Sequence, residues 1–175
     1  MSLYDILEEH RNIFCNDNSG LFAHTFPAFC VRDSDKMEKQ IDLAVESYAH
    51  ERGKKSYDGE FIILFRRPLG GGRQGMFVTD EALYYNDQND ESGKIRIKNI
   101  TSLRVGVGSN FLINRTVIRV GIDDKKAKLF ARCLIQHICE INGLEPPDFK
   151  YSGDWQIPSK ESQPKPEIDQ IGVVA

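Results

Sequence analysis

Apolar and polar residues alternate over short segments through the middle of the chain, and this period of two predicts β-strands. The clearest example is KIRIKN, residues 94–99, in which Ile95 and Ile97 face one side and basic residues face the other. The segments follow one another at about 8–12 residues, a spacing typical of an antiparallel sheet or barrel. The seven predicted strands are residues 60–67, 74–79, 82–86, 94–99, 101–108, 110–114 and 116–122.

An apolar stripe with helical spacing follows the last predicted strand and predicts a closing helix over residues 124–142. Asp123 or Asp124 is placed to cap its start, and Asn142-Gly143 supplies a left-handed stop. The residues of this stripe are Ala127, Phe130, Ala131, Leu134, Ile138 and Ile141.

The two ends of the chain show other patterns. Helical spacing over residues 2–14 and 34–50 predicts two N-terminal helices. Between them, residues 21–31 are aromatic and interrupted by Pro27, so this segment is either a strand or an extended segment laid on the core. From residue 151 the chain is polar and punctuated by proline, which predicts a tail or linker. Apolar residues in this tail favour docking on the rest of the chain, namely Trp155, Ile157, Ile168 and Ile171.

The composition is that of an ordinary globular protein. Of 175 residues, 40% are hydrophobic and 28% are charged, and no apolar run approaches the roughly 18 residues that cross a bilayer. The first residues, MSLYDILEEHRNIFC, carry acidic side chains and no unbroken apolar stretch, unlike a secretory signal. We therefore expect a cytoplasmic protein without a transmembrane segment, and reduced thiols rather than disulfides at its four cysteines.

Three longer segments of the strand region form a recognisable set. They are GMFVTDEALYYND, GKIRIKNITSLRVG and NRTVIRVGIDDKKAKLFARCLIQHI. Over residues 59–143 this set resembles bacterial PH-like and GRAM-like domains of the pleckstrin-homology-like superfold. The resemblance implies an α+β fold, with a seven-stranded antiparallel barrel or sheet capped by a C-terminal helix. It also implies a binding or scaffolding module rather than an enzyme, although a fold does not determine a function.

The resemblance divides the chain into three parts. Residues 1–58 are expected to form a helical extension, a two-helix arm packed on the domain, and residues 59–143 to form the PH-like domain. Residues 144–175 are expected to form a proline-containing polar tail.

The segment FRRPLGGGRQG, residues 65–75, joins the first two of the seven predicted strands. A Walker-type phosphate loop needs Gly-Lys-Ser/Thr followed by a helix, whereas a strand follows here, so a nucleotide-binding loop is excluded. In lipid-binding PH domains the loop after the first strand holds the head group, so the resemblance implies an anion site here. Two interpretations stay open: a site for an anionic lipid or phosphate, or a plain hairpin with solvated arginines. The candidate anion-binding residues are Arg66, Arg67, Gly71, Gly72 and Arg73.

Charge is distributed unevenly along the chain. Residues 94–132 carry a net charge of +8, whereas residues 1–60 carry −5 and the whole chain carries −3. We predict a basic face on the middle strands, which either binds a partner or is covered by the acidic helices or the acidic tail. The sequence pI of about 5.8 argues against general nucleic-acid binding. The predicted partner-binding residues are Lys94, Arg96, Lys98, Arg104 and Arg119.

Few side chains offer a pattern with catalytic or metal-binding chemistry. Cys133 and His137 lie four residues apart on the closing helix, a spacing that suits a metal but more often reflects core packing. Cys15 or Cys30 with His24 would make a thiol nucleophile and its base, but no local signature supports this. We therefore predict no catalytic residues, no metal site and no cofactor.

Taken together, these patterns favour a non-catalytic interaction module that binds a protein partner. An inhibitor or immunity-type protein, which blocks a toxin or an enzyme by surface complementarity, is one version of this function. The alternative is an anionic lipid- or phosphate-binding PH-like domain that acts through the loop at residues 65–75.

Overall fold

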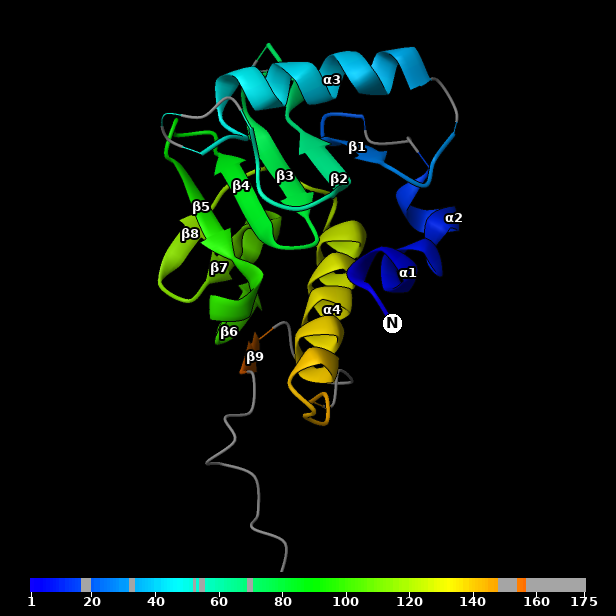
Figure 1. The fold of residues 1–175 in the computed structure, drawn as a ribbon. Coiled ribbons are helices and arrows are strands. Elements are labelled where there is room, and N and C mark those ends of the chain that lie inside the picture. The colour runs from blue at the N-terminus through cyan, green and yellow to red at the C-terminus, as the bar shows by residue number, and fades with distance from the viewer. Residues whose placement is uncertain are drawn as a thin grey trace, which may run out of the picture.

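Two antiparallel sheets and four helices surround a shared core in the computed structural model, within the residues that it describes (Figure 1). These are residues 1–16, 20–31, 34–51, 53, 56–68, 71–147 and 154–156. The class is α+β, as the sequence predicts. The structure therefore confirms the class, while the arrangement of the strands differs from the prediction.

The first sheet has five antiparallel strands that lie in the order of the sequence. They are β1 (His24–Pro27), β2 (Phe61–Arg66), β3 (Gly75–Thr79), β4 (Ala82–Asn86) and β5 (Ser92–Arg96). Of the two interpretations of residues 21–31, the structure contains the strand, because β1 pairs with β2. Pro27 is tolerated there because β1 lies at the edge of the sheet, where a missing backbone donor costs little.

The second sheet is smaller and has the strand order β8-β7-β6-β9. Its strands are β6 (Ser102–Val105), β7 (Phe111–Ile113), β8 (Thr116–Ile118) and β9 (Asp154–Gln156). The backbone of β9 belongs to the predicted tail and pairs antiparallel with β6. The tail therefore docks on the domain at residues 154–156, while Ile157, Ile168 and Ile171 lie outside the described residues.

All seven predicted segments contain a strand, but the expectation of a single seven-stranded sheet or barrel is wrong for the described residues. Four of the strands belong to the first sheet and three to the second, with β1 and β9 added at edges, and the described strands close no barrel. After β5 the chain does not continue as a strand to residue 99. It forms the 3₁₀ turn η2 (Ile97–Asn99), which buries Ile97 and Ile100 and starts β6 in a new sheet.

The helices confirm the predicted positions with corrections at their ends. They are α1 (Leu3–Glu8), α2 (Arg11–Phe14), α3 (Ser34–Ser47) and α4 (Asp124–Ile141). The single helix expected over residues 2–14 is broken at His10, whose backbone leaves the helical region. Asp123 caps α4, and the predicted apolar stripe of α4 is buried except for Ile141, which is 54% exposed at the end of the helix.

The first sheet has apolar residues on both faces. One face, with Leu64, Phe77 and Tyr84, packs under α3. The other face joins α1, α4 and the inner face of the second sheet in the main core. At a register shift between Phe61 and Ile63, the successive residues Ile62 and Ile63 both lie in the main core. The first 58 residues thus supply a strand, core side chains and a covering helix, while the domain limits taken from the resemblance stay a prediction.

A buried carboxylate joins the two sheets. Asp87 follows β4 and is fully buried. Its oxygens accept hydrogen bonds from the backbone N–H groups of Asn89 at 2.8 Å, Glu91 at 3.2 Å and Arg119 at 3.3 Å. Because Arg119 follows β8, this carboxylate links the end of the first sheet to the second.

Candidate functional site

The five predicted partner-binding residues do not share one face. Lys94 and Arg96 lie on β5 of the first sheet, and Lys98 lies in the turn η2 that follows. Arg104 lies on β6, and Arg119 follows β8 in the second sheet. The structure therefore divides the predicted basic face into two groups with different surroundings.

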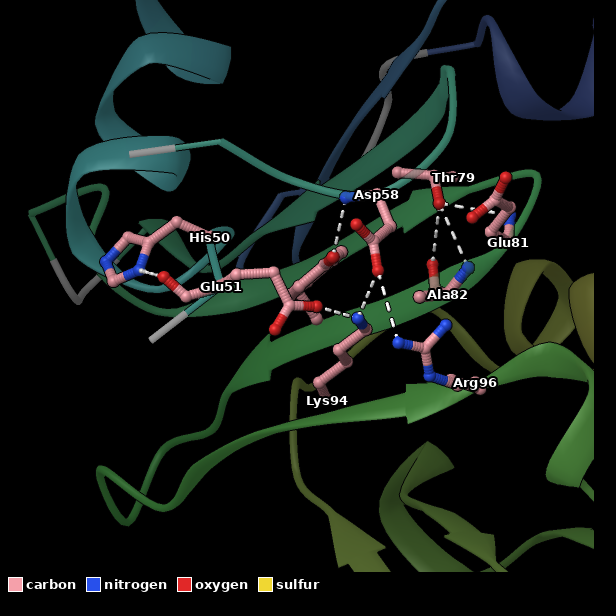
Figure 2. Close-up of polar contacts among 9 residues, drawn as sticks. His50, Glu51, Asp58, Thr79, Glu81, Ala82, Lys94 and Arg96 are labelled. Atoms are coloured by element: carbon pink, nitrogen blue, oxygen red, sulfur yellow. Dashed lines mark hydrogen bonds and ion pairs between the residues drawn. The ribbon is translucent and has the colours of Figure 1, made fainter. Parts of the chain in front are cut away.

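The Lys94 ammonium is held between two carboxylates. It contacts Glu51 and lies 2.6 Å from Asp58 Oδ2, and its side chain is only 19% exposed. Figure 2 shows the ammonium between these two acidic side chains, with Arg96 on the other side of Asp58. The Arg96 guanidinium lies 3.4 Å from Asp58 and is 46% exposed. We call Glu51, Asp58, Lys94 and Arg96 the paired cluster.

Tyr84 completes the surroundings of the paired cluster. The Lys94 ammonium lies 5.5 Å from the centre of the Tyr84 ring, and the backbone N–H of Asp58 donates to the Tyr84 hydroxyl at 2.8 Å. Partial burial, and then the Arg96 charge, lower the pKa of Lys94, whereas the two carboxylates in contact favour its charged form. Burial also raises the pKa of Tyr84, so its hydroxyl stays neutral.

The paired cluster fixes the segment after α3 onto the sheet. Its two acidic residues come from positions 51 and 58, and not from α3 or the tail, the sources suggested by the sequence. This pairing neutralises part of the predicted basic face from within the chain. Lys94 and Arg96 are therefore poor candidates for a partner site.

The outer face of the second sheet has a different environment. Register aligns Arg104 of β6 with Leu112 of β7 and Val117 of β8 in one row across the sheet. Arg104 is exposed, and Leu112 and Val117 are half-buried. The main core contains their neighbours Leu103, Val105, Phe111, Ile113 and Ile118. No ion pair of the described residues involves Arg104 or Arg119.

Two further cations lie at one end of this face. The Asn114 amide donates to the Asn99 carbonyl at 3.0 Å, so the turn that carries Lys98 lies against the turn that carries Arg115. Lys98 and Arg115 are both exposed. The sequence analysis did not include Arg115 because it lies in a turn. Its position between two short apolar strands could have identified it as an exposed cation at the end of the sheet. We use the name cationic face for the following residues: Lys98, Arg104, Leu112, Arg115, Val117 and Arg119.

The tail strand borders the cationic face. In the pairing of β6 with β9, Arg104 is the register partner of Asp154, and Leu103 is the partner of Trp155. The tail thus places the acidic position 154 beside Arg104. It adds a strand at the edge of the sheet and does not change the register of Arg104, Leu112 and Val117. The expectation that the tail docks near the basic residues agrees with this register.

The glycine-rich segment forms the end of the β2–β3 hairpin. Gly71 and Gly72 both have positive φ, 59° and 85°. A Cβ at Gly72 would lie 3.0 Å from Leu43 Cδ1 and 3.2 Å from Arg66 Nε, so this glycine lets α3 and Arg66 approach the loop. Arg73 is exposed, and its carbonyl accepts from the Asn86 amide at 2.8 Å.

Arg66 lies near the buried hydroxyl of Tyr48, the residue that follows α3. Within the described part of the chain, Arg66 Nε, Tyr48 Oη and Gln40 Oε1 are buried without a hydrogen-bond partner. A Cβ at Gly75, the register partner of Arg66, would lie 2.9 Å from Tyr48 Oη. Burial raises the pKa of Tyr48, and the Arg66 charge opposes this rise. Among the described residues, Arg66 is thus the predicted anion-binding residue whose side chain has a buried donor without a partner. The backbone N–H of Arg67 donates to the Gln74 carbonyl at 3.0 Å.

The other candidate groups have structural roles. The motif VTD consists of residues 78–80. Thr79 accepts hydrogen bonds from the N–H groups of Glu81 at 3.1 Å and Ala82 at 3.0 Å. Asp80 accepts a hydrogen bond from the Glu60 N–H at 2.7 Å. The motif therefore encodes the turn between β3 and β4. Cys133 is buried in the main core, and among the described residues no three His, Cys, Asp or Glu side chains gather as a metal site.

Comparisons with known proteins add no identification. No protein-family model matches the chain, and neither the curated proteins nor the solved structures contain a match. The resemblance to PH-like and GRAM-like domains therefore stays a prediction. Among the described helices, none combines the length and the apolar character needed to cross a bilayer.

Proposed function

We propose that the chain is a non-catalytic interaction module whose cationic face binds an acidic surface of a partner protein. One observation carries this proposal: Lys94 and Arg96 are neutralised by acids of the chain, whereas Arg104 and Arg119 have no ion pair among the described residues. Unpaired cations beside half-buried apolar side chains suit a protein interface, whose centre is apolar and whose rim is polar. An inhibitor or immunity-type protein is one version of this function.

Charge reversal on the cationic face tests the proposal. Arg104→Glu with Arg119→Glu should leave the fold intact and reduce the association rate with the partner, because long-range attraction between opposite charges speeds encounter. The partner would first be captured with the wild-type chain and then purified. Association kinetics at two or more salt concentrations would then give the rate and its salt dependence.

A matched control separates this face from net charge alone. Lys125→Glu with Lys128→Glu changes the net charge by the same amount on the exposed side of α4. We expect this control to bind the partner nearly as fast as the wild type. Equal effects of the two double reversals, or none from the first, would contradict the cationic face as the binding surface.

Arg66 supports a second candidate function, the binding of an anionic lipid or phosphate. A buried, unpaired donor costs about 1–3 kcal/mol, and an anion that accepts a hydrogen bond from Arg66 Nε would offset this cost. The adjacent Gly72 lacks a side chain that would block the approach.

Two probes and two variants test the second candidate. Wild-type binding to inorganic phosphate and to phosphatidylserine vesicles would be measured at low salt, together with Arg66→Ala and Arg73→Ala. A head-group site predicts binding to vesicles, and a small-anion site predicts binding to phosphate; both should be lost with Arg66→Ala and only weakened with Arg73→Ala. A wild-type chain that binds neither probe has a plain hairpin at residues 65–75.

A further inference from the structure

Two cysteines that are distant in the sequence meet at the surface of the main core. Cys15 caps the end of α2, and Cys30 lies in the turn after β1. Besides burial, the nearby Cys30 side chain raises the pKa of Cys15, and both cysteines are half-buried rather than fully enclosed. The thiols are therefore adjacent and also within reach of small molecules in solution.

Several contacts hold the two segments in this arrangement. An Arg11 guanidinium nitrogen, from the helix that ends at Cys15, donates to the Phe29 carbonyl at 2.9 Å. The Lys126 ammonium of α4 donates to the Asn16 carbonyl at 2.7 Å and to Thr25 Oγ1 at 3.3 Å. Phe29, beside Cys30, is thus tied to the helix that ends at Cys15, and Asn16, beside Cys15, is tied to α4, which holds the two segments side by side.

The other two cysteines provide a contrast. Cys133 and Cys139 lie on α4 and are buried in the main core. Full burial keeps both sulfurs away from small molecules in solution. Within one chain, two thiols are therefore placed for reaction and two are protected.

We propose that Cys15 and Cys30 form a reversible disulfide by exchange with a low-molecular-weight disulfide such as oxidised glutathione. The bond would close residues 15–30 into a covalent loop and join the end of α2 to the turn after β1. This redox site is independent of the cationic face and of Arg66.

The exchange proceeds in two steps that balance. The Cys30 thiolate attacks one sulfur of the small disulfide, breaks its S–S bond and releases one glutathione thiolate, which leaves a mixed disulfide on Cys30. Cys15 then loses its proton to the released thiolate or to water and attacks the Cys30 sulfur. The mixed disulfide breaks, and a second glutathione leaves. Two protein thiols are oxidised, and one molecule of oxidised glutathione is reduced to two of glutathione.

The environment of Cys15 fixes the order of these steps. Burial, and then the hydrogen bond and charge of Cys30, raise the pKa of Cys15 to about 12, against the opposing charges of Arg11 and Lys126. Cys15 is thus a poor first nucleophile in solution. It reacts once the mixed disulfide has placed an electrophilic sulfur next to it.

Thiol counting on the full native chain tests the proposal. The reduced chain would be treated with oxidised glutathione, alkylated after denaturation, digested without reductant and analysed by mass spectrometry. We expect a loss of two hydrogen atoms, about 2 Da, a peptide cross-link between Cys15 and Cys30, and alkylation of Cys133 and Cys139 only. Dithiothreitol should restore four free thiols, and oxidation should raise the melting temperature by roughly 5–10 °C.

Single variants check the order of attack. Cys15→Ser should stop at one glutathione on Cys30, and Cys30→Ser should leave Cys15 largely unmodified. The proposal is overturned if the wild-type chain keeps four free thiols, if it carries a separate glutathione on each of the two cysteines, or if the cross-link involves Cys133 or Cys139.

Discussion

The paired cluster and the cationic face contain the same kinds of basic residue on neighbouring strands, yet they differ in what lies across from them. Lys94 is enclosed by two carboxylates of the chain and an aromatic ring. Arg104 lies in register between Leu112 of β7 and Asp154 of the tail strand and has no ion pair among the described residues. The difference shows that a basic pattern on a strand does not define a binding surface until the segment that packs over that strand is known.

The origin of this difference lies in the chain path. The segment after α3 returns over the edge of the first sheet before β2 begins, and it brings Glu51 and Asp58 to β5. Within the described residues, the second sheet is bordered at β6 by the backbone of the tail strand β9. The cations of the first region are therefore paired within the chain, whereas Arg104 and Arg119 of the second have no ion pair among the described residues.

The largest change in stability is expected at Asp87, which joins the first sheet to the second. Asp87→Ala would remove the buried charged acceptor of three backbone N–H groups, so we expect a loss of about 2–4 kcal/mol in the free energy of unfolding. Urea denaturation monitored by the fluorescence of Trp155 and by circular dichroism would measure it. A loss under about 0.5 kcal/mol, the size of an ordinary surface change, would show that Asp87 does not stabilise this junction.

A smaller loss is expected inside the paired cluster. Lys94→Met keeps most of the apolar stem but leaves Glu51 and Asp58 without their shared cation, which should cost about 1–3 kcal/mol. Adding Asp58→Asn should recover part of the loss, and a double-mutant cycle in urea would give the coupling energy. Additive effects of the two changes would show that the pair contributes nothing specific.

Sequence patterns predicted the elements of this fold better than their assembly. Period-two alternation located the strand segments, and the stripe on α4 located its buried face, because both patterns record which side chains avoid water. The split into two sheets was missed because Ile97 continues the alternation of β5 while the backbone already turns as η2. Alternation reports burial, and a buried residue in a turn satisfies the same pattern.

The candidate site was predictable only in part. The basic residues could be identified from the sequence, but their partners could not. Lys94 is 43 positions from Glu51 and 36 positions from Asp58 along the chain. No local pattern encodes such a contact. The meeting of Cys15 with Cys30 was missed for the same reason, although both residues were singled out as thiols.

Arg96 provides a finer test of the comparison. It belongs to the paired cluster but is nearly half exposed and lies 3.4 Å from Asp58. Exposed ion pairs contribute about 0–1 kcal/mol, so Arg96→Ala should cost only a few tenths. A thermal melt at low and high salt would measure it. A loss as large as that of Lys94→Met would mean that the network, and not the burial of Lys94, provides the stability.

The smallest change in stability is expected on the cationic face itself. Arg104→Ala removes no ion pair of the described residues, so the free energy of unfolding should stay within about 0.5 kcal/mol of the wild type. The same urea titration would test this. A clear destabilisation would show that Arg104 is paired in solution, for example with the tail. The cationic face would then resemble the paired cluster, in which the chain neutralises its own cations.

The tail strand has a consequence for how copies of this chain behave toward one another. An uncovered β-strand at a sheet edge offers a ladder of free N–H and C=O groups, which other chains can extend into aggregates. Residues 154–156 occupy that ladder on β6, and Pro27 interrupts the edge of the first sheet at β1. A shortened protein that ends before residue 154 should therefore precipitate or self-associate more readily at high concentration, even where its core is fully folded.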